Sequence, residues 1–458
     1  MRIKPEQLRS FSTANHPEGD RILRVLAAGL NAVDPYEAVK RNLALNRNIL
    51  NARNRSYVLK NYKRIILVGA GKAAVPMTIA ATELFGDLIT SGIVITKRGH
   101  SHSEFHLPSR ILILEGGHPL PDQQGVLASQ KIIQLLANTQ SDDLVLFLLS
   151  GGGSALLTSP QAGITLLEVQ ALTAQLLACG ATIDELNTVR KHIDLVKGGG
   201  LVANAGPSDW LSLILSDVIG DPLDRIASGP TAPDPSTYED AYNILEKYKL
   251  LSQTPEAVIT HLKQGMKKQI PETPKPGDPV FNRVNNLIVG NNSLAAEAAI
   301  REATRLGFHT MLLTTSIQGE ASQVGIFLAA VAQQIYRSNQ PIPRPACLIA
   351  GGETTVTIRG EGSGGRNQEL ALGAVNQMAG LENSFIISLA TDGGDGPTDA
   401  AGAVVTGDTL TRALSMGNHP SDYLARNDSY HFFNALEDLL KPGPTLTNVG
   451  DLTFVFAS

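Results

Sequence analysis

The feature that most constrains the fold of this sequence is a short apolar run that ends in a glycine-rich loop, and such runs recur along the chain. In the fullest example, the run ACLI at residues 346–349 leads into AGGETTVTIRGEGSGGRNQE. An apolar run of this length before glycines is typical of a buried strand, and α/β sheets bind ligands at the loops that follow such strands. Arg366 follows two glycines at the start of a predicted helix, where backbone N–H groups and a guanidinium favour an anion. A glycine-rich hairpin with solvated charges is the alternative.

The alternation of such strands with helical segments predicts an α/β protein with two Rossmann-like, three-layer α/β/α domains and largely parallel sheets. The chain of 458 residues is too long for one ordinary domain. Residues 270–279 hold four prolines and show no helical or strand pattern. We therefore predict an N-terminal domain over residues 1–275, whose first 60 or so residues are helical, and a C-terminal domain over 281–458. The last predicted strand, 451–457, is compatible with either domain.

Composition excludes several kinds of partner. The chain is 43% hydrophobic, so it has enough apolar residues for full cores. Only 5% of its residues are aromatic and its net charge is −5, which argues against a nucleic-acid partner. Two cysteines in apolar runs suit buried thiols in a reducing compartment. The N-terminus lacks a signal-peptide pattern, and no apolar run approaches the ~18 residues of a membrane span. We expect a cytoplasmic protein without a membrane partner, and a homodimer stays open.

The motif GAGKAA follows a predicted strand at residues 64–68 and matches the dinucleotide-binding spacing G-x-G-x-x-A. Its glycines, Gly69 and Gly71, are therefore candidate nucleotide-binding residues. The next strand ends in Lys97 and Arg98, where an NAD enzyme carries an acidic residue, so this pattern would suit only NADP. The motif is not a P-loop either, because the required upstream glycine and the hydroxyl residue after the lysine are absent.

Lys72 of the same motif lies in the first turn of the predicted helix. Cations are disfavoured at a helix N-terminus, so Lys72 calls for an anionic partner. A solvated surface lysine is the alternative. His118, in the turn GGHPLPD, is either a ligand of the same site or a structural histidine, and the sequence does not decide between them.

A second glycine loop, SGGGSA, follows the predicted strand at residues 144–149. Consecutive glycines between hydroxyl residues favour an anion site, because their N–H groups can point the same way. A flexible linker is the alternative, although linkers rarely follow a buried strand directly. The candidate phosphate or substrate ligands in this loop are Ser150, Gly151, Gly152, Gly153 and Ser154.

The predicted helix DELNTVRKHIDLV at residues 184–196 ends at Lys197 and three glycines. Arg190 and Lys191 lie on a face of this helix, so they and Lys197 are candidate phosphate or substrate ligands. An exposed face with ordinary ion pairs is the commoner arrangement. Residues 219–238 follow without clear secondary structure, and a segment of that length is often functional, for example a lid.

A cluster of carboxylates, TDGGDGPTD, follows the predicted strand at residues 385–390. Asp392 and Asp395 are candidate ligands of Mg²⁺, which takes one or two carboxylates together with phosphate and water. Asx turns explain the same residues without a metal. Cations, glycine loops and clustered carboxylates are together the requirements of phosphoryl transfer, so the residues alone predict a phosphate-handling enzyme with two domains.

Eight motifs in order resemble those of the glycerate 2-kinase family that carries a C-terminal MOFRL domain. The resemblance extends from about residue 20 to the end. The motifs are VGAGKAA, GGHPLPDQQG, LLSGGGSALL, LNTVRKH with LVKGGGL, LSDVIGDPLDRIASGPTAPDPST, GGETTVTIRGEGSGGRNQE, ATDGGDGPTDAAGA and GPTLTNVGDL.

The resemblance implies phosphorylation of D-glycerate on its 2-hydroxyl, with ATP and Mg²⁺, in a cleft between two α/β domains. It implies that Lys72 and Arg366 are the basic residues of that cleft and that SGGGSA binds phosphate or substrate. The closing motif departs from the usual GPTGTNVNDL, because Leu446 and Gly450 replace a glycine and an asparagine. Asn448 and Asp451 of this motif are therefore weaker candidates for nucleotide binding.

Two other functions remain. An NADP-dependent hydroxypyruvate reductase would use GAGKAA together with Lys97 and Arg98, but no second catalytic signature accompanies them. A non-catalytic sugar-phosphate sensor would keep the glycine loops and would not need the aspartates at 392–399.

Overall fold

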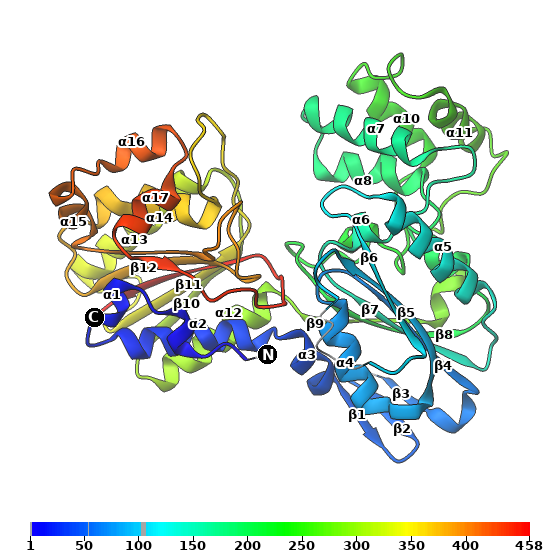
Figure 1. Ribbon diagram of the computed structural model, residues 1–458, viewed down its shortest axis with the longest axis horizontal. Helices are drawn as coiled ribbons and strands as arrows, with labels where there is room; N and C mark the ends of the chain where they lie inside the picture. The colour runs from blue at the N-terminus through cyan, green and yellow to red at the C-terminus, as the bar shows by residue number, and fades with distance from the viewer. Residues whose placement is uncertain (1, 54, 102–106) are drawn as a thin grey trace. The chain divides into compact units, whose positions relative to one another are not determined.

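The chain forms two compact units in the computed structural model, which describes residues 2–53, 55–101 and 107–458 (Figure 1). Unit 1 comprises Met1–Asp34 and Gly290–Ser458, and unit 2 comprises Pro35–Val289. This division differs from the predicted boundaries in two respects. The N-terminal helices belong with the C-terminal half, and the proline-rich segment 270–279 lies inside unit 2, before the last strand of that unit.

The sheet of unit 2 has six strands in the order β6-β5-β4-β7-β8-β9. Their bounds are β4 Arg64–Ala70, β5 Ile89–Lys97, β6 Ile111–Gly116, β7 Asp143–Leu149, β8 Asp209–Leu215 and β9 Val284–Gly290. Neighbours from β6 to β8 pair in parallel. Every residue of β7 is buried, which explains its continuous apolar sequence. The predicted parallel α/β sheet is confirmed in this unit.

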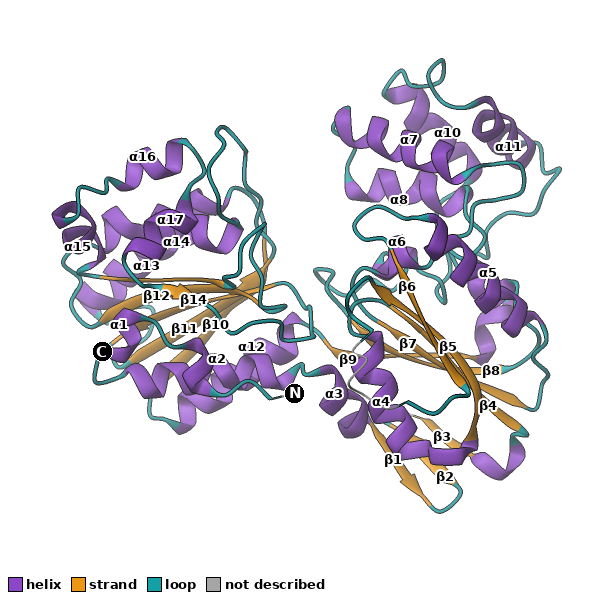
Figure 2. Ribbon diagram, in the orientation of Figure 1, coloured by secondary structure: helices purple, strands orange, loops and turns teal. Residues whose placement is uncertain are grey.

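Two groups of helices accompany this sheet. Their bounds are α3 Pro35–Asn42, α4 Ala74–Phe85, α5 Gln123–Ala137, α6 Gly153–Leu156, α7 Leu166–Ala178, α8 Ile183–His192, α9 Gly200–Ala203, α10 Tyr238–Lys247 and α11 Glu256–Met266. Helices α4 and α5 pack on the strands. Helices α7, α8, α10 and α11 form a cluster beyond the ends of the strands, with an apolar core of its own (Figure 2). Thr182 and Glu185 form the capping box that starts α8.

A small antiparallel sheet precedes β4, in a region predicted to be helical. Its strands are β1 Leu43–Asn46, β2 Ile49–Ala52 and β3 Arg55–Val58. The helical prediction is therefore wrong for this stretch. The hairpin between β1 and β2 turns at Arg47, which has a positive φ of 55° and is not a residue that signals such a turn.

The sheet of unit 1 is mixed, with the order β10-β11-β15-β12-β13-β14. Its strands are β10 His309–Ile317, β11 Ala346–Gly352, β12 Ser384–Ala390, β13 Gly402–Thr406, β14 Leu439–Leu440 and β15 Asp451–Ala457. Only β10 and β11 pair in parallel; the other pairs are antiparallel. The prediction of a largely parallel sheet is wrong here, because the C-terminal strand β15 returns antiparallel between β11 and β12. This pairing also places β15 in unit 1.

Helices cover both faces of that sheet: α2 and α12 lie on one face, and α13 and α14 on the other (Figures 1 and 2). The bounds are α1 Phe11–Ala14, α2 Gly19–Ala32, α12 Asn292–Arg305, α13 Ala321–Ser338, α14 Arg366–Met378, α15 Thr409–Ser415, α16 Pro420–Ala425 and α17 Ser429–Ala435. None of the described helices combines the length and apolarity needed to cross a bilayer.

The N-terminal segment joins unit 1 through both apolar and polar contacts. Helix α2 packs along α12 and buries a stripe of side chains that includes Leu23, Leu26 and Leu30. Ser12 donates hydrogen bonds to the buried Asp438 from its N–H and from its hydroxyl, each at 2.8 Å. Burial of this stripe explains why the first helices belong with residues far away in the sequence.

We predict that Leu26→Ala destabilises unit 1 selectively. Leu26 is fully buried, so its truncation should lower the free energy of unfolding by about 2–5 kcal/mol. Trp210, the only tryptophan, is buried in the sheet of unit 2, so its fluorescence follows the unfolding of that unit. In urea titrations, Leu26→Ala should move the circular-dichroism transition to lower urea and leave the tryptophan transition unchanged.

Ile132→Ala in α5 is the matched control, because Ile132 is equally buried and packs in the same core as Trp210. It should move the tryptophan transition. An equal shift of that transition by both variants would contradict the assignment of residues 1–34 to unit 1.

Candidate functional site

In unit 2, the two predicted glycine loops lie side by side at the carboxyl ends of β4 and β7. The two strands are parallel neighbours, with Ala70 opposite Leu149. The N–H of Lys72 donates to the carbonyl of Gly151 at 2.9 Å, and the N–H of Ala73 donates to Ser150 Oγ at 2.9 Å. The sheet and these bonds thus join GAGKAA and SGGGSA into one local structure.

The glycines of GAGKAA have packing roles within this structure. Gly71 has a φ of +126°, and a Cβ there would lie 2.2 Å from Ser150 Oγ. A Cβ on Gly69 would lie 3.0 Å from the Val94 side chain. The close approach of neighbouring loops and strands therefore explains why glycine occupies both positions, and no bound dinucleotide is needed for this explanation.

The SGGGSA loop presents amide groups that the protein does not use. Within the described residues, the N–H groups of Gly151, Gly152 and Ser154 donate to no protein acceptor, whereas those of Ser150 and Gly153 do. Gly152 is left-handed, with a φ of +82°. A glycine turn with several unpaired N–H groups is a typical anion-binding concavity. A ligand oxygen can supply the acceptor that these N–H groups lack within the protein.

Lys72 and His118 border the same loop. A Cβ on Gly152 would lie 3.0 Å from His118 Cδ2 and 3.4 Å from Lys72 Cγ. Burial lowers the pKa of His118 to about 4, and the positive charges of Lys72 and Lys97 lower it further. The imidazole is therefore neutral near pH 7, and it lies in a region of positive potential that favours an anion.

Arg190 and Lys197 bind the backbone at the end of the loop. Arg190 Nη2 donates to the carbonyl of Ser154 at 2.9 Å, and Lys197 Nζ donates to the same carbonyl at 2.8 Å. Lys197 Nζ also donates to the carbonyl of Leu157 at 2.9 Å and lies 3.5 Å from Asp194. Burial lowers the pKa of Lys197 to about 8. Both cations thus hold loop carbonyls, so their contacts are with the backbone of the predicted site.

Lys191 lies apart from this contact. It is buried and forms ion pairs with Asp224 at 3.5 Å and with Asp234 at 3.3 Å. Carboxylates of the protein therefore neutralise its charge. The sequence analysis weighed an exposed helix face with ordinary ion pairs; Lys191 is instead buried, and its partners lie outside α8.

The sequence analysis missed Ser228 and Asn187 as parts of this site. Ser228 Oγ lies 2.7 Å from Ser154 Oγ and donates to Asn187 Oδ1 at 3.1 Å. Ala227 and Ser228 both have left-handed backbones, with φ of 50° and 62°, which is uncommon outside glycine. This strained turn belongs to the segment 219–238 proposed as a lid, and it is hydrogen-bonded to the neighbouring KGGG backbone. The turn at Ala227 and Ser228 is recognised by its unusual backbone geometry, for which the sequence contains no signal.

In unit 1, Arg366 lies in an acidic cavity of about 690 Å³. Its Nε and Nη2 donate to the two carboxylate oxygens of Asp451 at 2.6 and 3.0 Å. Its Nη1 lies 2.9 Å from Glu353, whose side chain is 48% exposed. The structure therefore brings the predicted basic residue and the closing motif into direct contact. Glu369, Asp392 and Asp395 also line this cavity.

Asp395 occupies the anion site that we predicted at the start of α14. Its carboxylate accepts hydrogen bonds from the backbone N–H groups of Asn367 and Gln368 at 3.1 and 2.9 Å. Burial raises the pKa of Asp395 to about 6, although these amides favour the charged form. The N-terminus of α14 thus has an anion supplied by the chain itself.

The two carboxylates assigned to Mg²⁺ differ in their fit. Asp395 is buried and its oxygens are taken by N–H groups, so it does not fit as a ligand. Asp392 is half-buried, lines the cavity and accepts from the N–H of Gly394 at 3.2 Å. No three histidine, cysteine, aspartate or glutamate side chains within the described residues are grouped to hold a metal. A carboxylate that shares Mg²⁺ with phosphate oxygens does not need such a group, so Asp392 fits.

The closing motif lies beside Asp392. The N–H of Thr445 donates to the carbonyl of Asp392 at 3.2 Å. Leu446 has a φ of +65° and Gly450 a φ of +82°, so the two positions where the motif departs from its usual residues are both left-handed. Glycine and asparagine adopt this geometry readily, which explains the usual residues; leucine adopts it at a cost. Asn448 accepts from the N–H of Gly450 at 3.3 Å.

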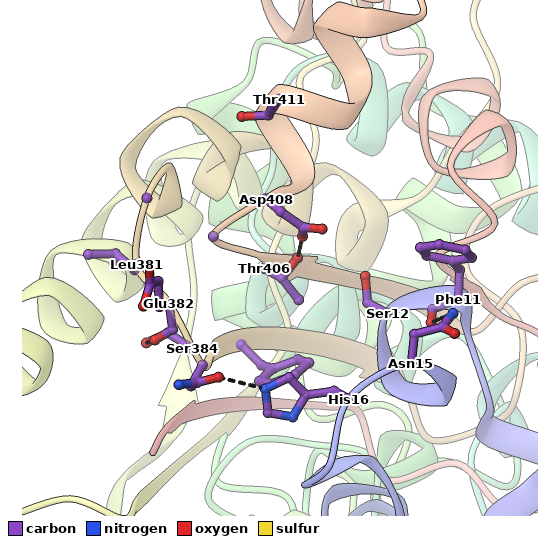
Figure 3. A pocket seen from close by; sticks show the side chains of 14 residues that line it. Phe11, Ser12, Asn15, His16, Leu381, Glu382, Ser384, Thr406, Asp408 and Thr411 are labelled. Atoms are coloured by element: carbon purple, nitrogen blue, oxygen red, sulfur yellow. Dashed lines mark hydrogen bonds between the residues drawn. The ribbon is translucent and has the colours of Figure 1, made fainter.

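Another cavity of unit 1, of about 460 Å³, contains none of the predicted site residues (Figure 3). It lies where the N-terminal segment meets the loops before β12 and after β13. His16 Nε2 and Asn383 Oδ1 lie 3.0 Å apart across it. The described residues that line it include no lysine or arginine, so it does not resemble a phosphate site.

Nearly the whole chain is similar to known proteins. Residues 21–263 match a domain of unknown function (DUF4147), and residues 346–451 match the MOFRL family. A D-glycerate 2-kinase of Thermotoga maritima is 42% identical over 94% of this chain and 96% of its own length. A glycerate 2-kinase of Pyrococcus horikoshii is 38% identical over 95% of this chain and 96% of its own.

A third relative and a solved structure extend this similarity. A protein of Agrobacterium vitis, provisionally named a hydroxypyruvate reductase, is 40% identical over 98% of this chain and 96% of its own length. The crystal structure of a glycerate kinase from Thermotoga maritima aligns with a TM-score of 0.84 at 41% identity, covering 95% of this chain and 98% of that one.

We predict that His118 stays neutral down to about pH 4. Its pKa is about 4 in the folded state, against ~6.5 in an unfolded chain, so the unfolded chain binds more protons between these values. His118 therefore favours unfolding as the pH falls through this window. Its imidazole resonances in NMR should not titrate between pH 5 and 8.

Lys72→Met tests the cause of this pKa. Loss of the neighbouring charge should raise the titration midpoint of His118, while burial keeps it below the ordinary value. A midpoint near 6.5 in the unmodified protein would contradict the geometry around Gly152.

Proposed function

This chain belongs to the glycerate kinase family with a C-terminal MOFRL domain, and we propose that its glycine loops and paired cations carry out the phosphoryl transfer. It is a glycerate 2-kinase, a phosphotransferase with an alcohol group as acceptor. The proposed substrates are D-glycerate and ATP, with Mg²⁺ as the accompanying ion, and the product is 2-phospho-D-glycerate.

The observation that carries the proposed mechanism is the set of unpaired N–H groups of Gly151, Gly152 and Ser154, next to Lys72. Fixed N–H groups and a lysine can hold the oxygens of a carboxylate or of a transferring phosphoryl group without reorganising. In this mechanism, Lys72 stabilises the charge on that phosphoryl group. Either the glycerate carboxylate or the γ-phosphate occupies the loop.

In this proposal, Arg190 and Lys197 bind the backbone of the loop, and the N–H groups of the loop bind the ligand. Their side chains hold the carbonyl of Ser154, and these bonds anchor the backbone directly after the unpaired N–H groups. His118 is neutral and can donate or accept one hydrogen bond at the edge of the loop. Lys191 has a structural role.

Arg366 is the second cation of the mechanism. Its bidentate partner Asp451 is 8% exposed, whereas Glu353, on its other side, is 48% exposed. Exposed ion pairs are weak, so a substrate anion can replace Glu353 while Asp451 keeps the guanidinium oriented. The proposal therefore assigns Asp451 to Arg366 and not to the nucleotide.

Asp392 would hold Mg²⁺ in this proposal, together with phosphate oxygens. The ion would neutralise charge on the nucleotide phosphates. Asn448 remains a candidate for nucleotide binding, because its loop contacts the backbone of Asp392. Gly69 and Gly71 have packing roles, so they do not require a nucleotide.

The second candidate function is an NADP-dependent hydroxypyruvate reductase, which the provisional name of the Agrobacterium vitis relative suggests. Against it, Arg98 forms an ion pair with Asp122 at 2.9 Å, which occupies one of the two cations that NADP would need. Lys97 and Arg98 lie at the end of β5.

A pair of assays on the same purified protein separates these functions. Release of ADP from ATP and Mg²⁺ should depend on D-glycerate and yield the 2-phosphate. Oxidation of NADPH by hydroxypyruvate should be absent. Oxidation of NADPH without release of ADP would overturn the proposal, and silence in both assays would favour a sensor.

We predict that Lys72→Ala lowers kcat by ~10²-fold or more, the loss typical of one charge-stabilising donor. Lys131→Ala, an exposed lysine of α5 in the same unit, is the control and should keep its activity. Steady-state kinetics with D-glycerate measure both variants. An unchanged kcat in Lys72→Ala would show that Lys72 does not act on the reacting phosphoryl group.

A further inference from the structure

The Asp395 carboxylate is completely engaged by the first turn of α14. Oδ1 accepts from the N–H of Asn367 at 3.1 Å and from its side-chain amide at 3.3 Å. Oδ2 accepts from the N–H of Gln368 at 2.9 Å and from its side-chain amide at 3.1 Å. Asp395 is 2% exposed. An ionised carboxylate has about four lone-pair sites, so these four donors leave no site for a cation.

Neighbouring glycines make this approach possible. Gly365 has an extended backbone, with a φ of −146°, which any residue can adopt. A Cβ on Gly365 would nevertheless lie 2.3 Å from Asp395 Cγ. Gly396, with a φ of +63°, would place a Cβ 2.2 Å from the carbonyl of Gly364. The glycines on both sides therefore serve the contact between this carboxylate and the helix.

The contact between Asp395 and the first turn of α14 is connected to both Arg366 and Asp451. Arg366 directly precedes Asn367, whose side-chain oxygen accepts from Ser388 Oγ at 2.6 Å. Ser388 Oγ lies 3.0 Å from Thr453 Oγ1, two residues after Asp451 on β15. A continuous hydrogen-bond network therefore runs from Asp395 through the start of α14 to the strand that carries the partner of Arg366.

We propose that Asp395 is a positioning residue, which holds the first turn of α14 so that Arg366 meets Asp451, and that it is not a metal ligand. The inference rests on the proposed function, because the position of Arg366 matters to catalysis only if it handles substrate charge. It also assigns Mg²⁺ to Asp392, which lines the cavity that contains Arg366.

Asp395→Asn tests the proposal by replacing a carboxylate oxygen with an N–H₂ group that faces N–H donors. Hydrogen–deuterium exchange, followed by mass spectrometry, should become faster in the first turn of α14. The affinity for Mn²⁺ in the presence of ADP, measured by electron paramagnetic resonance, should change less than ~3-fold. Asp392→Asn should show the reverse, with a Kd for Mn²⁺ raised ~10-fold or more, the size of metal-site losses.

Asp399→Asn is the matched control, because Asp399 lies in the same loop and its side chain is mostly exposed. Neither exchange in α14 nor binding of Mn²⁺ should change in this variant. A tenfold loss of Mn²⁺ affinity in Asp395→Asn, with exchange in α14 unaltered, would overturn the proposal.

A double-mutant cycle on kcat tests whether Asp395 acts through Arg366. Asp395→Asn should lower kcat by ~10-fold or more, as lost outer-shell partners do. Adding it to Arg366→Ala should cost little more, because residues in one network are not additive. Multiplicative losses would overturn the positioning role. Absence of kinase activity in the unmodified protein would instead defeat the proposed function, and the exchange and Mn²⁺ results would still decide the role of Asp395.

Gly365→Ala provides a second variant in case Asp395→Asn fails to fold. The added methyl would displace the carboxylate from α14 while leaving its charge in place. Faster exchange in α14 with unchanged Mn²⁺ affinity is again the expected result. Unchanged exchange in α14 would contradict the proposal that the Asp395 carboxylate holds the first turn of this helix.

Discussion

The antiparallel pairing of β15 between β11 and β12 is the interaction on which the candidate site of unit 1 depends. It places Asp451 opposite Gly352 on one side and opposite Ala390 on the other. These two residues end their strands, so the first residue of β15 lies at the sheet edge from which the ligand-bearing loops begin. Parallel strands alone would bring those loops together. The inserted strand adds a buried carboxylate among them, and that carboxylate orients Arg366.

The site of unit 2 reaches a similar result by a different arrangement. Here the loops after β4 and β7 bond to one another, and three cations contact them. Arg190 and Lys197 use their charges on a backbone carbonyl, whereas Lys72 borders the glycine turn. Burial lowers the pKa of His118, and the positive charges of Lys72 and Lys97 lower it further. An anion bound by the unpaired N–H groups next to Lys72 is stabilised both by hydrogen bonds and by the positive charge of the lysine.

The sequence pattern predicted Asp395 as a ligand of Mg²⁺, but the pattern alone does not tell which carboxylate of the loop is accessible to a metal. Carboxylates after a strand are candidates for Mg²⁺, and Asp392 and Asp395 share that pattern. Their roles diverge because one carboxylate faces a cavity and the other faces the N-terminus of α14. The glycines that permit the second contact were visible in the sequence, but they equally suit a phosphate loop. The resemblance of Arg366 to a substrate-binding cation did not reveal its bond to Asp451, 85 residues away.

The sequence by itself determined the local elements: the buried strands before the glycine loops, the helices that follow several of these loops, the α/β class and the family. These follow from periodicity, glycine geometry and short motifs, which act over a few residues. Only the tertiary structure decided that residues 1–34 join unit 1, that the sheet of unit 1 is mixed, and which side chain each charge meets. These features depend on burial and on contacts between residues that are distant along the chain, so local sequence patterns do not predict them.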